Sequence, residues 1–245
     1  GRAGPPAQAA PAARAAIPAR PAGVTPDMVA SVIFTCGTAV EPRGAVLTHR
    51  SFIADLLALA EVQRLYDTDQ IVSLLPLHHG LEFTGGLLMS LWGGATTTYL
   101  ETINSREILD TVRATGTTVL LAVPRLLKIL ADRIQRLEAH AGEGEVAPRS
   151  RSLARVRLVV SGGAPLAPEL FDVYQRLGVA VYEWYGLTEA GPIATVNPPG
   201  RARRGSVGQA LPGVEIAIEQ AGVQGHGQIL VRGPNVMVGY YANPE

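Results

Sequence analysis

Short apolar or β-branched runs alternate along the chain with longer segments in which apolar residues recur every three to four positions. The runs that predict strands lie at residues 30–35, 71–75, 95–99, 117–122, 156–160 and 179–183. The segments with a helical period lie at residues 52–66, 81–91, 106–115, 124–139 and 168–177. Strands that alternate with helices are typical of βαβ units. The pattern therefore predicts an α/β fold with a mainly parallel sheet and flanking helices.

The two ends of the chain differ from this middle part. Residues 1–24 are rich in alanine and proline and contain no acid, which favours a linker or tail and leaves a transit peptide as the alternative. After about residue 204 the pattern changes to short strands between glycines, at 214–218 and 228–231, with no helix. We expect an α/β core at 25–203 and the truncated start of a smaller β-rich subdomain at 204–245, in a fragment of a longer protein.

One uncharged run, residues 83–100, approaches the length of a membrane span, about 18 residues. Four glycines and several hydroxyl residues interrupt it, so it reads as a helix, a turn and a strand. We therefore expect a core segment and no transmembrane helix.

Composition limits the classes of function. Apolar types make up 47% of the chain and charged types 17%, which is typical of a chain that buries a core. Basic and acidic residues number 21 each, so no overall basic field exists to attract nucleic acid, and we expect no nucleic-acid partner. The single cysteine, Cys36, excludes an intramolecular disulfide and a cysteine-based zinc cluster, and fits a reducing compartment.

Three loops that follow predicted strands carry residues suited to binding. Residues 35–44 combine small and hydroxyl residues with the cation Arg43, a set that suits phosphate, although an ordinary Gly/Pro loop fits equally well. Residues 161–166 contain two glycines, which allow close approach of a flat ligand or form a plain turn. Residues 185–189 hold an aromatic ring, a hydroxyl and a carboxylate, which could contact a base, a phosphate and Mg²⁺. Alternatively, Thr188 and Glu189 cap a helix.

In their order and spacing, these loops resemble motifs of the acyl-adenylate-forming (AMP-binding) superfamily. That superfamily includes acyl-CoA synthetases, fatty acyl-AMP ligases, luciferases and peptide-synthetase adenylation domains. Residues 35–44, followed by Val46-Leu47-Thr48-His49, are similar to its phosphate loop, and residues 75–79 to its Leu-Pro-Leu-Phe-His motif. Three further matches are at residues 163–166, 185–189 and 233–241. The resemblance runs from about residue 25 to 245 and is strongest to fatty acyl-CoA synthetases (long-chain fatty acid–CoA ligases).

The resemblance implies a reaction and its participants. A carboxylate attacks the α-phosphate of ATP, Mg²⁺-bound pyrophosphate leaves, and a thiol then attacks the acyl-AMP. The implied partners are a small carboxylic acid, most suitably a fatty acid, then ATP, and coenzyme A or the pantetheine of an acyl carrier protein. ATP and thiol supply imply a cytoplasmic location, and a fatty substrate leaves peripheral contact with a membrane open.

The resemblance also assigns roles to residues. The β- and γ-phosphates would contact Thr35, Cys36, Gly37, Thr38 and Arg43. The nucleotide would lie against Gly163, Ala164, Pro165, Glu183, Trp184, Tyr185 and Gly186. Thr188 would contact the α-phosphate, Glu189 would bind Mg²⁺, and His79 would lie near the acyl carboxylate. His79, Thr188, Glu189 and Arg43 are thus the expected catalytic residues, with a purely structural histidine as the alternative for His79.

The chain also departs from the family pattern. Cys36, Ala39, Val40 and Arg43 stand where the family has serine, a hydroxyl residue, glycine and lysine. Fewer hydroxyls mean fewer hydrogen bonds to phosphate, and a β-branched residue cannot easily adopt a positive φ. No later Thr-Gly-Asp and no C-terminal catalytic lysine follow within these residues, so we expect the fragment alone to be inactive. The alternative function is therefore a degenerate, catalytically weak or inactive module with a binding or scaffolding role.

Overall fold

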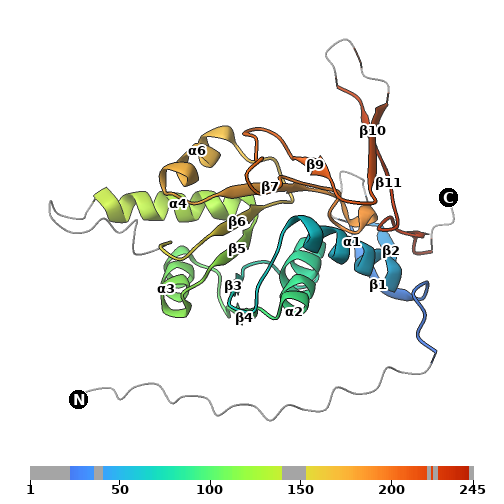
Figure 1. The fold of residues 1–245 in the computed structure, drawn as a ribbon, viewed down its shortest axis with the longest axis horizontal. Helices are drawn as coiled ribbons and strands as arrows, with labels where there is room; N and C mark the ends of the chain where they lie inside the picture. Colours follow the sequence, from blue (N-terminus) through green and yellow to red (C-terminus); the bar gives the residue numbers. More distant parts are fainter. Residues whose placement is uncertain (1–22, 36–40, 140–152, 220–221, 223–225, 243–245) are drawn as a thin grey trace.

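The computed structural model describes residues 23–35, 41–139, 153–219, 222 and 226–242. Its centre is a seven-stranded sheet with the strand order β4-β3-β5-β6-β7-β8-β9 (Figure 1). The strands are β3 (Gln70–Ser73), β4 (Thr96–Tyr99), β5 (Val119–Ala122), β6 (Leu158–Ser161), β7 (Val181–Tyr185), β8 (Thr195–Val196) and β9 (Gln209–Ala210). Pairing is parallel from β4 to β7 and antiparallel from β7 to β9. The predicted α/β fold with a mainly parallel sheet is confirmed.

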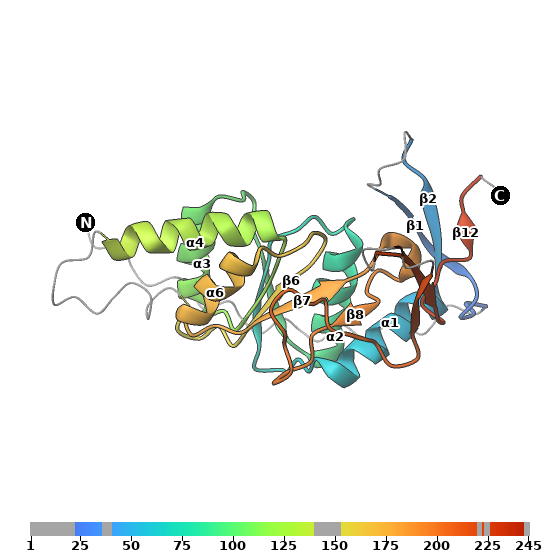
Figure 2. The same cartoon turned by 90° about the horizontal axis from the view of Figure 1, so that it is seen from above.

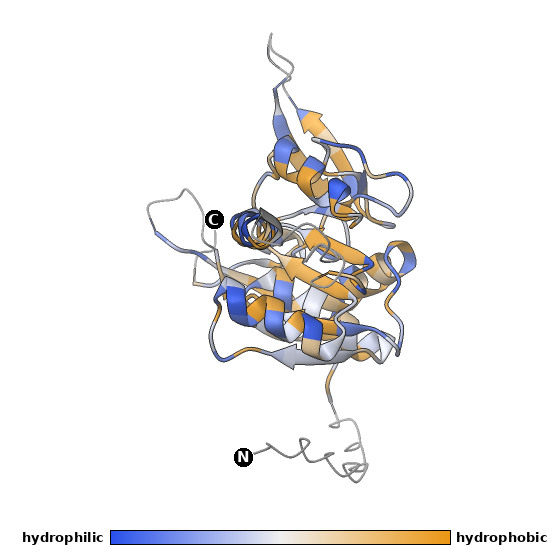
Figure 3. Ribbon diagram, turned by 90° about the vertical axis from the view of Figure 1, so that its left-hand side faces the viewer, coloured by the Kyte–Doolittle hydropathy of each residue, from blue (hydrophilic) through white to orange (hydrophobic). Residues whose placement is uncertain are grey.

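Helices cover both faces of this sheet because its central strands are apolar on both sides. All four residues of β5 are buried, and they alternate between the two faces. Leu120 and Ala122 pack with α3 (Ser105–Thr115), α4 (Pro124–Ala139) and α6 (Pro168–Arg176). Val119 and Leu121 pack with α1 (His49–Val62) and α2 (Met89–Gly93). In Figure 3 the sheet is largely orange, whereas each helix carries both colours.

The first predicted strand lies outside the parallel sheet. The strand β1 (Val29–Phe34) pairs antiparallel with β2 (Gly44–Thr48), and β2 pairs antiparallel with β12 (Gly239–Tyr240). This three-stranded sheet lies beside α1, at one end of the molecule in Figure 2. The segment 35–44 is therefore a connection within an antiparallel hairpin and not a turn from a parallel strand into a helix, as the alternation of elements had suggested.

The uncharged run at 83–100 forms the predicted helix, turn and strand. A π-helical segment, η1 (Glu82–Leu88), continues into α2, which ends at Gly94 in the left-handed region before β4 begins. None of the helices formed by the described residues is long and apolar enough to cross a bilayer.

The C-terminal segment contributes to all three sheets. Besides β9 and β12, it forms a separate antiparallel hairpin of β10 (Glu215–Glu219) and β11 (Gln228–Arg232), which projects from the body in Figure 1. Since β12 returns to β2, residues 233–241 bring the end of the chain next to the first hairpin. Segments from both ends of the sequence thereby lie side by side.

Candidate functional site

A cleft of about 360 Å³ opens where several loops meet at the carboxyl ends of the parallel strands. Eight of the residues that the sequence assigned to a site line it, and they come from four separate motifs. They are Thr35, His79, Gly163, Trp184, Tyr185, Gly186, Thr188 and Glu189. Ligands of open parallel sheets bind at this edge, so the position of the cleft is the one expected for a binding site.

The imidazole of His79 faces the loop after β6. Gly163 of that loop has a φ of +79°, which favours glycine, and a Cβ atom there would lie 3.9 Å from His79 Cε1. The Leu81 backbone N–H donates to His79 Nδ1 at 3.3 Å. Partial burial and the neighbouring His78 lower the pKa of His79. The ring is therefore neutral at pH 7 with its proton on Nε2, which is a hydrogen-bond donor suited to a carboxylate or phosphate oxygen.

Glu183 supports the glycine loop from the face of β7 opposite to Trp184. Its buried side chain accepts a hydrogen bond of 3.4 Å from the Leu166 backbone N–H, and burial raises its pKa. Ala164 and Pro165 are exposed on the same loop. These three predicted nucleotide residues are absent from the cleft lining formed by the described part of the chain. Glu183 holds the loop in place instead.

Glu189 stands at the rim of the cleft in a short 3₁₀ helix, η2 (Thr188–Ala190). Leu187 is the N-cap of this helix and makes no side-chain capping bond, so the capping alternative does not describe Thr188 or Glu189. The Tyr240 hydroxyl donates to Glu189 Oε1 at 2.7 Å. Within the described residues there is no cluster of three or more possible metal ligands. A single carboxylate is nevertheless a donor that fits Mg²⁺, which keeps several waters and binds proteins through one or two carboxylates plus substrate phosphates.

Arg43 is connected to the cleft through Tyr240. Its guanidinium carbon lies 5.3 Å from the centre of the Tyr240 ring. The Thr35 backbone N–H donates to the Arg43 carbonyl at 2.8 Å, which closes the base of the hairpin connection. Cys36, Gly37 and Thr38, which were predicted to bind phosphate, lie outside the described residues, as do Ala39 and Val40.

The loop at 187–193 is held by buried polar groups that sequence reasoning missed. The Asn235 side chain donates to the carbonyls of Ala190 at 2.7 Å and Ile193 at 3.3 Å. The Ile193 backbone N–H donates to the fully buried Asp55 at 3.3 Å, and burial raises the pKa of this carboxyl well above its usual range. Residues 233–241 were recognised as a motif, but Asn235 and Tyr240 within it were assigned no role at the site. The only signal for them in the sequence was a polar and an aromatic side chain in a largely apolar segment.

A second buried carboxyl, Glu82, makes stability depend on pH. It is 1% exposed, the Ser73 hydroxyl donates to it at 2.7 Å, and burial raises its pKa from 4.5 to about 6. A raised pKa stabilises the folded state at low pH, and this contribution is lost as the pH rises through 6. We compare the free energy of unfolding of Glu82→Gln with that of the parent at each pH. Between pH 4.5 and pH 8 this difference should shift in favour of Glu82→Gln by about 2 kcal/mol.

Urea unfolding of both proteins at these two pH values measures the difference. Glu101→Gln, an exposed substitution of the same kind, serves as the control and should follow the parent at both pH values. Stability differences between Glu82→Gln and the parent that do not change with pH would show that the carboxyl titrates normally.

Comparisons with known proteins agree with the geometry. The family model described as "AMP-binding enzyme" matches residues 2–241. The mitochondrial malonate–CoA ligase ACSF3 of Mus musculus is 32% identical in an alignment of 250 positions that covers 89% of this chain and 42% of the ligase. Long-chain-fatty-acid–CoA ligase 6 of Homo sapiens is 31% identical in an alignment of 260 positions that covers 90% of this chain and 37% of the ligase. The chain thus spans well under half the length of these relatives.

A solved structure gives the same picture. A malonyl-CoA ligase in a ternary product complex, with methylmalonyl-CoA and AMP bound, superposes with a TM-score of 0.79 at 31% identity. The match covers 95% of this chain and 49% of that one. The family resemblance inferred from the motifs is confirmed, as is its partial coverage of the family's length.

Proposed function

Because this chain belongs to the AMP-binding enzyme family, we propose that it is the part of an acid–thiol ligase that binds ATP and activates a carboxylic acid as acyl-AMP. The acyl group then passes to a thiol, coenzyme A or a carrier pantetheine. The observation that carries the proposal is the cleft, which brings together residues as distant in sequence as Thr35, His79, Gly163 and Glu189. The activity belongs to the natural-length protein, and the fragment alone is expected to be inactive.

Five residues of the cleft would take part in this reaction. Mg²⁺, when bound at Glu189, would supply positive charge to the phosphate oxygens. The neutral His79 ring would donate a hydrogen bond from Nε2 to the attacking carboxylate or the α-phosphate. Gly163, which has no side chain, and the Tyr185 ring would contact the adenine base, and Thr188 would contact the α-phosphate. Such a reaction depends on alignment and charge neutralisation, which these groups can provide without a protein nucleophile.

The identity of the carboxylic acid substrate is a more specific part of the proposal. The sequence favours a fatty acid, whereas the relatives are named for malonate and for long-chain fatty acids at nearly equal identity. Trp184 lines the cleft, and its buried indole packs on Gly85, where a Cβ atom would lie 2.8 Å from Trp184 Cζ3. Because the motifs resemble fatty acyl-CoA synthetases most, we propose a fatty acid of medium or long chain. The supply of ATP and thiol favours a cytoplasmic location.

Acid-dependent exchange between ATP and pyrophosphate in the natural-length protein tests the proposal. Acetate, malonate, octanoate and palmitate form the panel of acids. Exchange with one of them would support adenylation and identify the substrate class. The alternative, a degenerate binding or scaffolding module, is favoured by the altered loop at Cys36, Ala39 and Val40. A folded protein that neither exchanges nor binds Mg²⁺·ATP would establish that alternative.

A further inference from the structure

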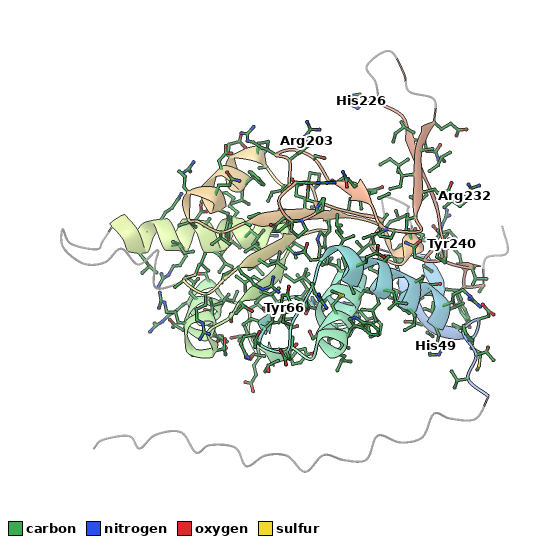
Figure 4. All side chains as sticks on the ribbon, in the orientation of Figure 1. His49, Tyr66, Arg203, His226, Arg232 and Tyr240 are labelled. Carbon is green, nitrogen blue, oxygen red and sulfur yellow. The ribbon has the colours of Figure 1, made fainter. Side chains whose placement is uncertain are left out.

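Tyr240 connects the two charged residues assigned to the phosphate end of the cleft. Its hydroxyl donates to Glu189 Oε1 at 2.7 Å, and its ring lies 5.3 Å from the Arg43 guanidinium carbon. Glu189 and Arg43 are far apart in sequence and lie on different elements. A single side chain from β12 thus contacts both. Figure 4 labels Tyr240 near the base of the β10–β11 hairpin.

The backbone on both sides of Tyr240 is fixed. Tyr240 pairs with Ala45 of β2, and the Tyr241 N–H donates to the Gly44 carbonyl at 2.7 Å. Three residues before Tyr240, the Met237 N–H donates to the Glu189 carbonyl at 2.8 Å. The backbone of Tyr240 is therefore fixed to the first hairpin and close to the Glu189 loop, and the contacts with Glu189 and Arg43 hold the ring. A side chain held at both ends of its segment is suited to orienting its neighbours.

The phenol acts as a donor at neutral pH. A tyrosine hydroxyl carries its proton at this pH and donates a hydrogen bond to Glu189 Oε1. Because the hydroxyl keeps its proton, Glu189 Oε1 remains occupied as an acceptor and the second carboxylate oxygen is left for a cation. The ring face meanwhile attracts the Arg43 guanidinium and limits its rotation.

We propose that Tyr240 is a positioning residue of the adenylation site, which orients the Glu189 carboxylate for Mg²⁺ and holds Arg43 beside it. This inference rests on the proposed function, because it assigns Glu189 and Arg43 to the metal and phosphates of ATP. Tyr240 itself need not touch substrate. It would set the affinity for the metal–nucleotide complex through its two neighbours.

Two substitutions in the natural-length protein separate the two contacts. Tyr240→Phe removes the hydroxyl and keeps the ring over Arg43, whereas Tyr240→Leu removes both. Tyr241→Phe is the matched control, because the neighbouring side chain is 65% exposed and the change leaves its backbone bond intact. Thermal unfolding of all three shows whether each protein is folded before binding is compared.

The metal affinity is measured directly, with Mn²⁺ as the probe, by electron paramagnetic resonance in the presence of α,β-methylene ATP. We expect Tyr240→Phe to weaken Mn²⁺ binding about tenfold, the loss typical of one hydrogen bond to a charged group. The Mg²⁺ concentration for half-maximal pyrophosphate exchange should rise by a similar factor. Tyr240→Leu should in addition raise the KM for ATP about threefold, since the cation–π contact is also lost.

The outcomes are distinct. Equal Mn²⁺ affinity in Tyr240→Phe and the parent, or equal losses in Tyr240→Phe and Tyr241→Phe, would overturn the positioning role. A parent protein that shows no exchange with any acid would refute the proposed function instead, and the Mn²⁺ titration would still decide the role of Tyr240. If the parent binds no Mn²⁺–nucleotide complex, both proposals fail.

Discussion

Replacement of Glu189 by glutamine is expected to lower acid-dependent pyrophosphate exchange in the natural-length protein by a factor of about 100 or more. The substitution removes the negative charge at the cleft rim that is proposed to bind Mg²⁺, and a lost group of this kind typically costs such a factor. The shape of the side chain is kept. A glutamine carbonyl oxygen can still accept from the Tyr240 hydroxyl, and the Met237 bond to the backbone carbonyl is unaffected. Folding should therefore be preserved.

The control is Glu101→Gln, an exposed change of the same chemistry away from the cleft. Thermal unfolding should place both variants within a few degrees of the parent, while exchange falls only in Glu189→Gln. Excess Mg²⁺ should restore part of the lost exchange if the metal can still bind through phosphate and water. Full exchange at low Mg²⁺ in Glu189→Gln would remove Glu189 from the metal site.

The central sheet was predictable because its strands are buried on both faces. Runs such as residues 117–122 and 156–160 are largely apolar, and such runs between helical segments are typical of parallel strands. The helix predicted at 106–115 was also clear: it forms α3 (Ser105–Thr115), and its N-cap Asn104 accepts from the Glu107 N–H at 2.9 Å. The local signals at these places agree with the tertiary structure.

Pairing partners were harder to predict than elements. The strand at 30–35 looks like its neighbours in sequence, but it pairs antiparallel with residues 44–48, which were recognised only as the end of a motif. A two-residue strand such as β12 has no periodicity at all, and its place is set by hydrogen bonds to β2. Sequence alone therefore could not show that residues 233–241 return to the first hairpin.

The residues of the candidate site also fall into a predictable group and an unpredictable one. Motif residues that follow strands, such as His79, Gly163 and Glu189, do line one cleft, because parallel strands bring their carboxyl ends to one edge. Glu183 belongs to the same motif region but points to the opposite face, where it holds the Leu166 amide. The place of Tyr240 at the site depends on the pairing of β12 with β2, which the sequence does not predict. Local sequence patterns do not show which distant segments are in contact.

Gly186→Ala is expected to destroy the cleft wall and with it the binding of Mg²⁺·ATP. Gly186 follows β7, and a Cβ atom there would overlap the Pro192 carbonyl oxygen and lie 2.8 Å from Ile193 Cα. Both obstacles are backbone, which cannot rotate away. The Pro192–Ile193 segment is itself fixed, since the Ala194 N–H donates to the Tyr185 carbonyl at 2.8 Å and the Ile193 N–H donates to Asp55. One methyl group must therefore push apart the two segments that form the wall.

The cost of this overpacking is expected to be about 3 kcal/mol in the free energy of unfolding, with ATP binding lost below the unfolding temperature. Gly200→Ala is the matched control. Gly200 has a φ of +73°, and a Cβ atom added there would meet nothing within 4 Å, so alanine adds backbone strain of about 1 kcal/mol without any clash. Differential scanning fluorimetry with and without Mg²⁺·ATP compares the two. Retained nucleotide stabilisation in Gly186→Ala would mean that the loop at 187–193 can move aside, and that its buried bonds to Asp55 and Asn235 do not fix the cleft.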